Sequence, residues 1–180
     1  MSHIELVHAS CADLKADVAV NAANRNLRAG GGICGVIFSK AGIKELTEAC
    51  QKFSLPLKDG EAVITPSFHM NNVKAVIHAV GPDFSVTPEA FSTLCDAYYH
   101  SLLVLMENGY HSIAFPLISS GIYGGSLQNP VAESVKQCIT AYQKFVSEFP
   151  DYCIDVKLCA YTEREMENAG KEWNRIKCVF

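Results

Sequence analysis

Apolar and polar positions along the chain follow two periods, which predict strands and helices in alternation. Short apolar runs predict strands, and apolar residues at three- and four-residue spacing predict amphipathic helices. The predicted strands are residues 4–7, 17–21, 61–65, 73–80, 112–117 and 154–161. The predicted helices are residues 33–41, 44–52, 88–108, 131–148 and 163–177. This alternation predicts an α/β fold, in which helices cover both faces of a mostly parallel sheet.

The helix expected over residues 88–108 has a clear amphipathic pattern. Its apolar residues recur at helical steps: Phe91, Leu94, Cys95, Tyr98, Leu102 and Leu105. Thr87 followed by Pro88 suits a helix start, and Gly109 suits a helix end. The runs 73–80 and 113–118 are almost wholly apolar, which is typical of strands that are buried on both faces.

Composition and charge narrow the class of protein. Hydrophobic residues make up 49% and charged residues 19% of the chain, which indicates a globular protein. We find no internal repeat or linker, so we expect residues 1–180 to form a single domain. The formal net charge of −4 argues against a nucleic-acid partner. There is no signal-peptide pattern and no apolar run of about 20 residues, so we expect a cytoplasmic monomer with no membrane partner.

Cysteine and histidine positions indicate neither a disulfide framework nor a metal site. The chain has 8 cysteines, none in a C-x-x-C pair, and most lie in apolar stretches. We interpret them as free, buried thiols in a reducing compartment. Cysteine and histidine do not cluster at ligand spacing, and we find no carboxylate cluster for magnesium, so we expect no metal and no cofactor. His78 lies in an apolar run and is interpreted as a core histidine.

Two glycine-rich loops carry the candidate chemistry. The first contains Gly30, Gly31 and Gly32 and precedes a predicted helix, and the second runs from Ile118 to Gly125. Glycines leave backbone N–H groups unobstructed, and a helix N-terminus attracts anions. Neither loop matches the Walker pattern, and the G-x-G-x-x-G spacing in the first loop is a weak signal alone. Because each loop follows a strand, we expect both at the carboxyl edge of the sheet, holding a diphosphate without metal.

Polar groups beside these glycines add candidate contacts. Ser119 and Ser120 bring hydroxyl donors next to the backbone N–H groups of Gly121 and Ile122. Asn24 follows the second predicted strand, and its amide offers both a donor and an acceptor to a sugar hydroxyl. The two loops therefore predict a site for a diphosphate with a sugar beside it.

The order of these motifs resembles the macro domain family. The matching segments are Asn21–Asn24 with Gly30–Gly32, then residues 60–65, 76–82 and 113–124, in the family's order. Residues 79–85 are also similar to the viral branch of the family. The resemblance implies a three-layer α/β/α sandwich with a mixed, mostly parallel sheet that binds ADP-ribose.

The resemblance also implies roles for individual residues. The residues implied to line the distal ribose and the diphosphate are Asn24, Gly30, Gly31, Gly32, Ile33 and Cys34. Those implied to close over the diphosphate from the other side are Ser119, Ser120, Gly121, Ile122 and Tyr123. Tyr161 would lie against the adenine. Ser10, with Cys11 next to it, stands where family members carry an aspartate that reads the adenine, which implies weaker adenine selectivity.

Hydrolysis of an ADP-ribosyl ester is the activity that the resemblance implies. The substrate would be mono-ADP-ribose on protein Asp or Glu, or O-acetyl-ADP-ribose. Asn24, Gly32 and Tyr123 are the expected catalytic residues, around a water that the substrate's own phosphate helps to activate. Many hydrolases of the family carry an aspartate where this chain has Cys34, so an ADP-ribose reader without turnover is the alternative. We do not expect Cys34 to act as a nucleophile, because a diphosphate would repel its thiolate.

Overall fold

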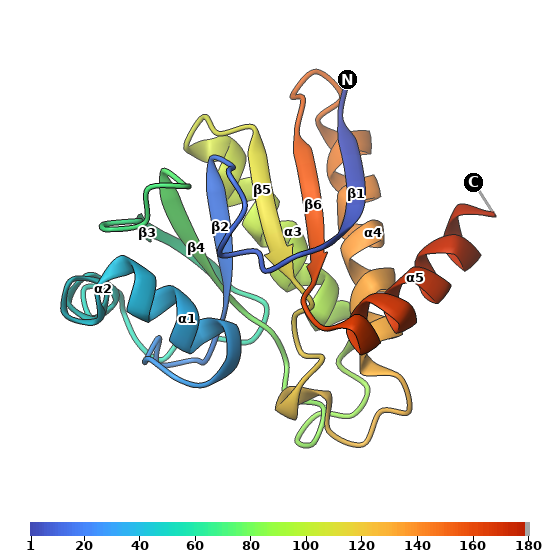
Figure 1. Ribbon diagram of the computed structural model, residues 1–180, viewed down its shortest axis with the longest axis horizontal. Coiled ribbons are helices and arrows are strands. Elements are labelled where there is room, and N and C mark those ends of the chain that lie inside the picture. The colour runs from blue at the N-terminus through green and yellow to red at the C-terminus, as the bar shows by residue number, and fades with distance from the viewer. Residues whose placement is uncertain (179–180) are drawn as a thin grey trace.

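The computed structural model describes residues 1–178, and its centre is a six-stranded sheet with the order β1-β6-β5-β2-β4-β3 (Figure 1). The strands are β1 (His3–His8), β2 (Val18–Ala23), β3 (Ala62–Pro66), β4 (Ala75–Val80), β5 (Ser112–Pro116) and β6 (Asp155–Ala160). Strand β3 runs antiparallel to β4, and the other pairs are parallel. The predicted mixed, mostly parallel sheet is confirmed. Residues 179 and 180, which the single-domain prediction includes, lie outside the described residues.

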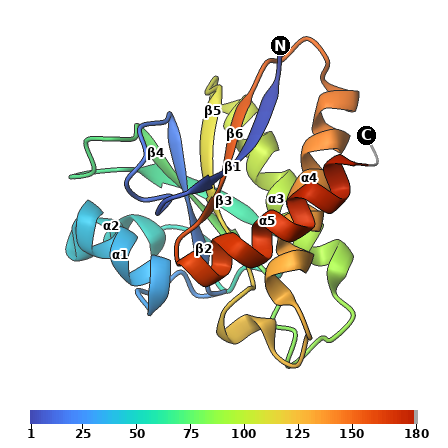
Figure 2. The same ribbon diagram turned by 45° about the vertical axis from the view of Figure 1, so that its right-hand side comes forward.

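Helices cover both faces of this sheet (Figures 1 and 2). On one face lie α1 (Gly32–Ala41) and α2 (Ile43–Cys50), and on the other lie α3 (Phe91–Glu107) and α4 (Pro130–Glu148). Helix α5 (Glu163–Lys177) packs on α4 and on strands β1 and β6. The three-layer arrangement is therefore confirmed. Among the helices of residues 1–178, none combines the length and the apolar character needed to cross a membrane.

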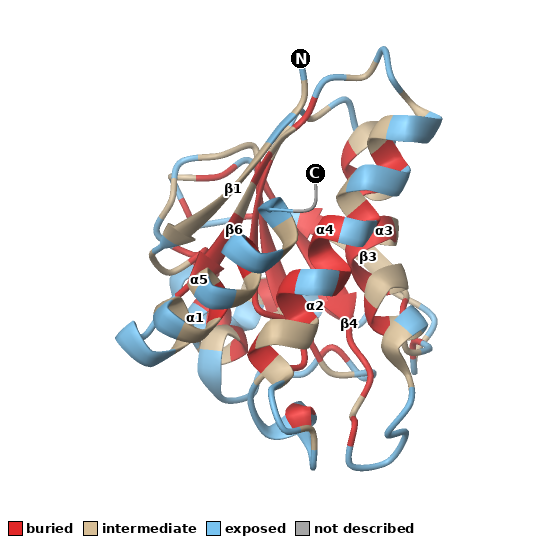
Figure 3. Ribbon diagram, turned by 90° about the vertical axis from the view of Figure 1, so that its right-hand side faces the viewer, coloured by how far each residue is buried: buried red, intermediate tan, exposed pale blue. Residues whose placement is uncertain are grey.

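The core occupies the two spaces between the sheet and its helices, and Figure 3 shows the buried residues along the strands and the inner helix faces. Side chains of a strand alternate between the faces of a sheet. On β2, Val18 and Val20 therefore pack with α3 and α4, whereas Ala19 and Ala23 pack with α1 and α2. Asn21 lies between these two alanines and is fully buried on the α1 side. This places a polar side chain beneath the first glycine loop.

One predicted element boundary is wrong by three residues. Helix α3 begins at Phe91 and not at Pro88, because Thr87 belongs to a turn: its N–H and its hydroxyl donate to the Asp83 carbonyl at 2.9 and 3.2 Å. The strand predicted from Val73 begins at Ala75. This boundary and all the others lie within two residues of the prediction.

Asp17 ties together the amino ends of three strands. Its carboxylate accepts the N–H groups of His111 and Ser112 at 2.8 and 3.2 Å, and it pairs with Lys74 at 3.0 Å. Burial raises the pKa of Asp17, but these three donors together outweigh burial and hold the pKa below its ordinary value. The ionised carboxylate therefore stabilises the folded chain.

We expect Asp17→Ala to lower the free energy of unfolding by about 1–2 kcal/mol at neutral pH, because it removes a charged acceptor from two backbone donors. Since the pKa is lowered in the folded state, this stabilisation is present above the unfolded pKa and is lost as the pH falls through the folded pKa. Urea unfolding should therefore show a difference in the free energy of unfolding between the wild type and Asp17→Ala that becomes smaller at acidic pH. Asp151→Ala, at an exposed carboxylate, is the control. A difference that stays constant down to acidic pH would contradict this account.

Candidate functional site

Strands β2 and β5 are neighbours that separate toward their carboxyl ends. They pair at two register positions, residues 18–19 with 113–114, whereas β2 and β4 pair along six. Farther along β2, the carbonyl of Val20 accepts the thiol of Cys11 at 3.5 Å. The first loop leaves β2 and the second leaves β5, at the same edge of the sheet (Figure 1). Neighbouring strands thus bring the two loops to the same edge of the sheet.

The Asn24 side chain braces the first loop. Its Oδ1 accepts the Arg28 N–H at 3.0 Å, and its Nδ2 donates to the Arg28 carbonyl at 2.8 Å. The Cys34 thiol donates to the same carbonyl at 3.4 Å. The Asn24 amide keeps a second N–H and a second lone pair. The predicted contact with a sugar hydroxyl therefore stays compatible with the brace.

Free backbone donors line this loop. Within the described residues, the N–H group of Gly31 makes no hydrogen bond to the protein. Helix α1 begins at Gly32, so the N–H groups of its first turn also lack a helical acceptor. The positive end of the helix dipole lies at the same place. The loop thus offers an anion a row of main-chain donors.

Two positions show why the loop requires glycine. Gly32 has a φ of +59°, in the left-handed region that glycine adopts without strain. At Gly35, in the first turns of α1, a Cβ would lie 2.5 Å from the Gly30 carbonyl oxygen. The loop therefore lies directly against the helix, and a side chain at Gly35 would displace it.

The serine hydroxyls of the second loop are engaged within the protein. Ser119 Oγ donates to the Pro82 carbonyl and Ser120 Oγ donates to the Leu117 carbonyl, both at 2.7 Å. A hydroxyl has one hydrogen, so the hydrogens predicted to face the ligand are already donated in this arrangement. Within residues 1–178, the N–H groups of Ser119, Ser120 and Gly121 make no hydrogen bond to the protein. The main chain therefore supplies the available donors of this loop too.

An ion pair anchors the first loop, and two exposed side chains mark the second. Asp59 holds Arg25 of the first loop with hydrogen bonds of 2.8 and 2.9 Å and raises the pKa of Arg25. Tyr123 is 36% exposed and its neighbour Ile122 is 93% exposed, both in the short helix η1 (Ile122–Gly124). These side chains form the outer rim of the second loop.

Ser10, Cys11 and Tyr161 follow β1 and β6 at the same edge of the sheet. Ser10 is half-buried, and its oxygen accepts the Ala12 N–H at 3.3 Å. Cys11 is 2% exposed and burial raises the pKa of its thiol well above the ordinary value, so only its main chain is available to a ligand. Tyr161 is exposed and leaves its ring free.

Cys34 lies beneath the glycine loop in the first turn of α1. Burial raises the pKa of the Cys34 thiol and outweighs the Asn21 amide and the Gly30 main chain, which lower it. A helix N-terminus on its own would favour the thiolate. Here the thiol stays protonated at neutral pH, which argues against Cys34 as a nucleophile or as a general base.

A buried hydrogen-bonded group under α1 includes one residue that sequence reasoning missed, Asn21. The Asn21 amide nitrogen lies 3.0 Å from His78 Nδ1, and Thr65 Oγ1 lies 3.0 Å from His78 Nε2. His78 is fully buried, and burial lowers its pKa to about 4. The interpretation of His78 as a satisfied core histidine is confirmed. An asparagine inside a buried strand was the available signal for Asn21, because a buried amide needs a polar partner.

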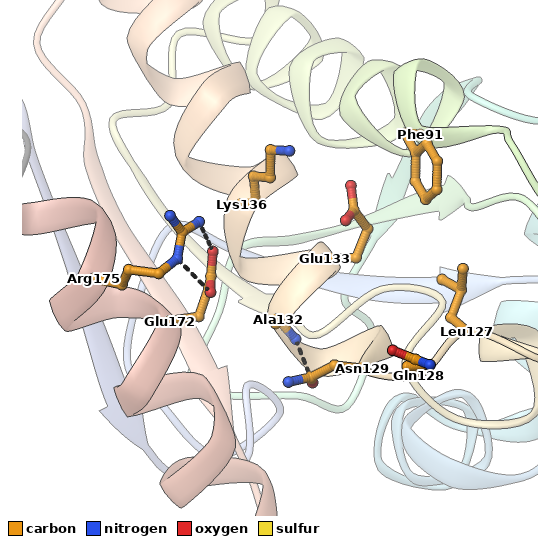
Figure 4. Close-up of a pocket in the computed structure, with 9 residues that line it drawn as sticks. All are labelled: Phe91, Leu127, Gln128, Asn129, Ala132, Glu133, Lys136, Glu172 and Arg175. Carbon is orange, nitrogen blue, oxygen red and sulfur yellow. Dashed lines mark hydrogen bonds and ion pairs between the residues drawn. The ribbon is translucent and has the colours of Figure 1, made fainter.

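A separate hollow of about 310 Å³ lies between the start of α4 and the second half of α5 (Figure 4). Its lining residues are Phe91, Leu127, Gln128, Asn129, Ala132, Glu133, Lys136, Glu172 and Arg175. None of the predicted site residues borders it, so the candidate site rests on the two loops. Within residues 1–178, no three His, Cys, Asp or Glu side chains are grouped to hold a metal ion.

Comparisons with known proteins agree on one family. The Macro domain family matches residues 20–134. O-acetyl-ADP-ribose deacetylase of Citrobacter koseri is 44% identical over 127 residues, which are 68% of this chain and 71% of that protein. The Oceanobacillus iheyensis macrodomain with ADP has a TM-score of 0.88 at 29% identity, covering 99% of this chain and 94% of its own. The Trypanosoma brucei macrodomain in complex with ADP-ribose has a TM-score of 0.80 at 30% identity, and the match covers 99% of this chain and 69% of that chain. The chain therefore belongs to the macro domain family.

Proposed function

We propose that the protein binds ADP-ribose and hydrolyses the ester of O-acetyl-ADP-ribose. The observation that carries the proposal is a pair of loops that leave neighbouring strands at one edge of the sheet and have free backbone N–H groups. Such donors, together with a helix N-terminus, offset the charge of a diphosphate without a metal ion. Family membership supports the ligand, and the relative named O-acetyl-ADP-ribose deacetylase supports the reaction.

The ligand would lie along the carboxyl edge of the sheet. Gly30–Cys34 would bind the diphosphate and the distal ribose through the main chain, and residues 119–123 would close over the diphosphate from the other side. The exposed Tyr161 ring offers a face for the adenine. The Ser10 hydroxyl has its hydrogen available and serves the base as donor or acceptor, so we expect weaker selectivity for adenine than a carboxylate would give.

Hydrolysis requires a water placed against the ester carbonyl. Cys34 is protonated and buried, so it supplies no general base, and the substrate's own phosphate takes that role. The protein contributes orientation and electrostatic stabilisation. Nothing lies within 4 Å of the position of a Cβ at Gly32, which leaves room there for the water. Asn24 positions the ribose and Tyr123 caps it.

The same ester linkage joins ADP-ribose to protein Asp or Glu, so mono-ADP-ribosylated proteins are the second substrate that we propose. A reader without turnover is not favoured, because the relative named above carries the name of a hydrolase. One chain supplies both loops, which supports a single-domain monomer. The cysteines are free, which suits the reducing cytoplasm.

We expect Asn24→Ala to lower kcat/KM for O-acetyl-ADP-ribose by about tenfold, the effect of one lost hydrogen-bonding group of about 1.4 kcal/mol. Acetate release measures the effect, and ADP-ribose calorimetry runs in parallel. Asn26→Ala is the matched control, because Asn26 is an exposed asparagine of the same loop.

The outcomes separate binding from catalysis. If the wild type binds ADP-ribose but releases no acetate above a protein-free blank, the proposed hydrolase activity is wrong and the protein is a binding module. Equal kcat/KM values for Asn24→Ala and Asn26→Ala would show that Asn24 is not a catalytic residue. Absence of ADP-ribose binding by the wild type would overturn the proposed ligand.

A further inference from the structure

Two buried side-chain hydroxyls hold both main-chain groups of Ile118, just before the free donors of the second loop. The Ile118 N–H donates to the Tyr98 hydroxyl oxygen at 2.9 Å, and the Ile118 carbonyl accepts the Ser134 hydroxyl at 2.7 Å. Tyr98 belongs to α3 and Ser134 to α4, and both side chains are fully buried. Two helices thus fix the position at which the chain enters the loop.

These groups form a closed cycle of hydrogen bonds. The hydroxyl oxygens of Tyr98 and Ser134 lie 2.6 Å apart. Each hydroxyl has a single hydrogen. Ser134 donates its hydrogen to Ile118, so Tyr98 donates to Ser134 and accepts from Ile118. The Pro116 carbonyl, 3.1 Å from the Tyr98 hydroxyl, is a second acceptor on the same strand end. A buried network whose members satisfy one another favours one geometry of the main chain.

The cycle is adjacent to a strained residue. Ser119 has a φ of +58°, which is unfavourable for a residue other than glycine. Its hydroxyl is held by the Pro82 carbonyl at 2.7 Å. Gly81 packs so closely that a Cβ there would collide with the side chains of Ile118 and Ser119. Contacts from α3, α4 and the end of β4 therefore impose this conformation, which sets the direction of the N–H groups that follow.

We propose that Tyr98 and Ser134 are positioning residues that preorganise the second loop for the diphosphate of ADP-ribose. The proposal rests on the proposed binding of ADP-ribose. Neither hydroxyl reaches solvent, so neither touches the ligand, and both act through the main chain of Ile118. Without the cycle, the loop must be ordered when the ligand binds, and this ordering lowers the affinity.

The test compares variants that each remove one buried hydroxyl. We expect Tyr98→Phe and Ser134→Ala each to weaken ADP-ribose binding by about tenfold, measured by calorimetry well below the unfolding temperature. Tyr99→Phe and Ser101→Ala are the matched controls on α3. The Tyr99 hydroxyl donates to Glu148, and the Ser101 hydroxyl donates to the Ala97 carbonyl at 2.7 Å, so neither contacts the loop. The controls should lose stability without losing affinity.

A second measurement follows the loop without ligand. In ¹H–¹⁵N spectra, the amide signals of residues 119–121 should broaden or multiply in Tyr98→Phe and Ser134→Ala and stay unchanged in the controls. Unchanged signals and unchanged affinity in both cycle variants would overturn the proposal, as would equal losses in all four variants. If the wild type binds no ADP-ribose, the proposed function fails, and the amide signals still decide whether the cycle orders the loop. If Tyr98→Phe does not fold, Ser134→Ala decides alone.

Discussion

Gly35→Ala should lower kcat/KM for O-acetyl-ADP-ribose by about a hundredfold, with a matching loss of ADP-ribose affinity. The new Cβ would lie 2.5 Å from the Gly30 carbonyl oxygen, so either α1 or the glycine loop must move. The loop yields first, because the Gly31 N–H group has no partner within the described residues. Misplacement of a positioning group by about 1 Å costs on the order of a hundredfold in rate. Acetate release and calorimetry measure the two losses.

The fold itself should change much less. Alanine is favoured over glycine inside a helix by about 1 kcal/mol, whereas overpacking costs about 1–3 kcal/mol. The net loss in the free energy of unfolding should therefore be at most about 2 kcal/mol. Gly170→Ala on α5 is the matched control, because a Cβ there meets nothing within 4 Å. It should stabilise the protein by up to about 1 kcal/mol and leave binding unchanged. Wild-type affinity in Gly35→Ala would show that the loop does not depend on its contact with α1.

Mild acid should destabilise the protein through His78. Burial lowers the pKa of His78 to about 4, from 6.5 for an exposed histidine. Its neighbours are the Asn21 amide, the Thr65 hydroxyl and, at 3.9 Å, the Cys50 thiol, so no carboxylate compensates a charge on the ring. Between these pKa values the unfolded chain binds a proton that the folded chain does not. The free energy of unfolding therefore has its full value above the unfolded pKa and falls as the pH drops, by about 2 kcal/mol at pH 5 relative to pH 7.

Urea unfolding at pH 7, 6 and 5 measures this loss, and His78→Gln should flatten the slope over the same range. The variant removes a buried group and can lower stability overall, so the slope and not the absolute value is the test. NMR titration of the imidazole in the wild type gives a second measurement: His78 should stay neutral down to pH 5. A folded-state midpoint near the ordinary value would contradict the account.

The sequence alone determined the elements and the place of the candidate site. Strand and helix periods are local properties, so α5 (Glu163–Lys177) was predicted at its observed bounds. Glycine-rich loops after strands of a mostly parallel sheet must lie at its carboxyl edge, and both do. The predicted helix start at Pro88 is wrong because the N–H and hydroxyl of Thr87 donate to the Asp83 carbonyl and form a turn. A proline at a turn and a proline at a helix start look alike in sequence.

Only the tertiary structure decided how the loops are built. The separation of β2 from β5 and the antiparallel direction of β3 depend on pairing between distant segments. The Ser119 and Ser120 hydroxyls point to carbonyl groups because other parts of the chain lie within reach. The raised pKa of Cys34 depends on burial, which packing alone sets. The cycle of Tyr98, Ser134 and Ile118 joins two helices to one strand end. Periodicity describes neighbours along the chain, whereas these contacts join residues that only the folded chain brings together.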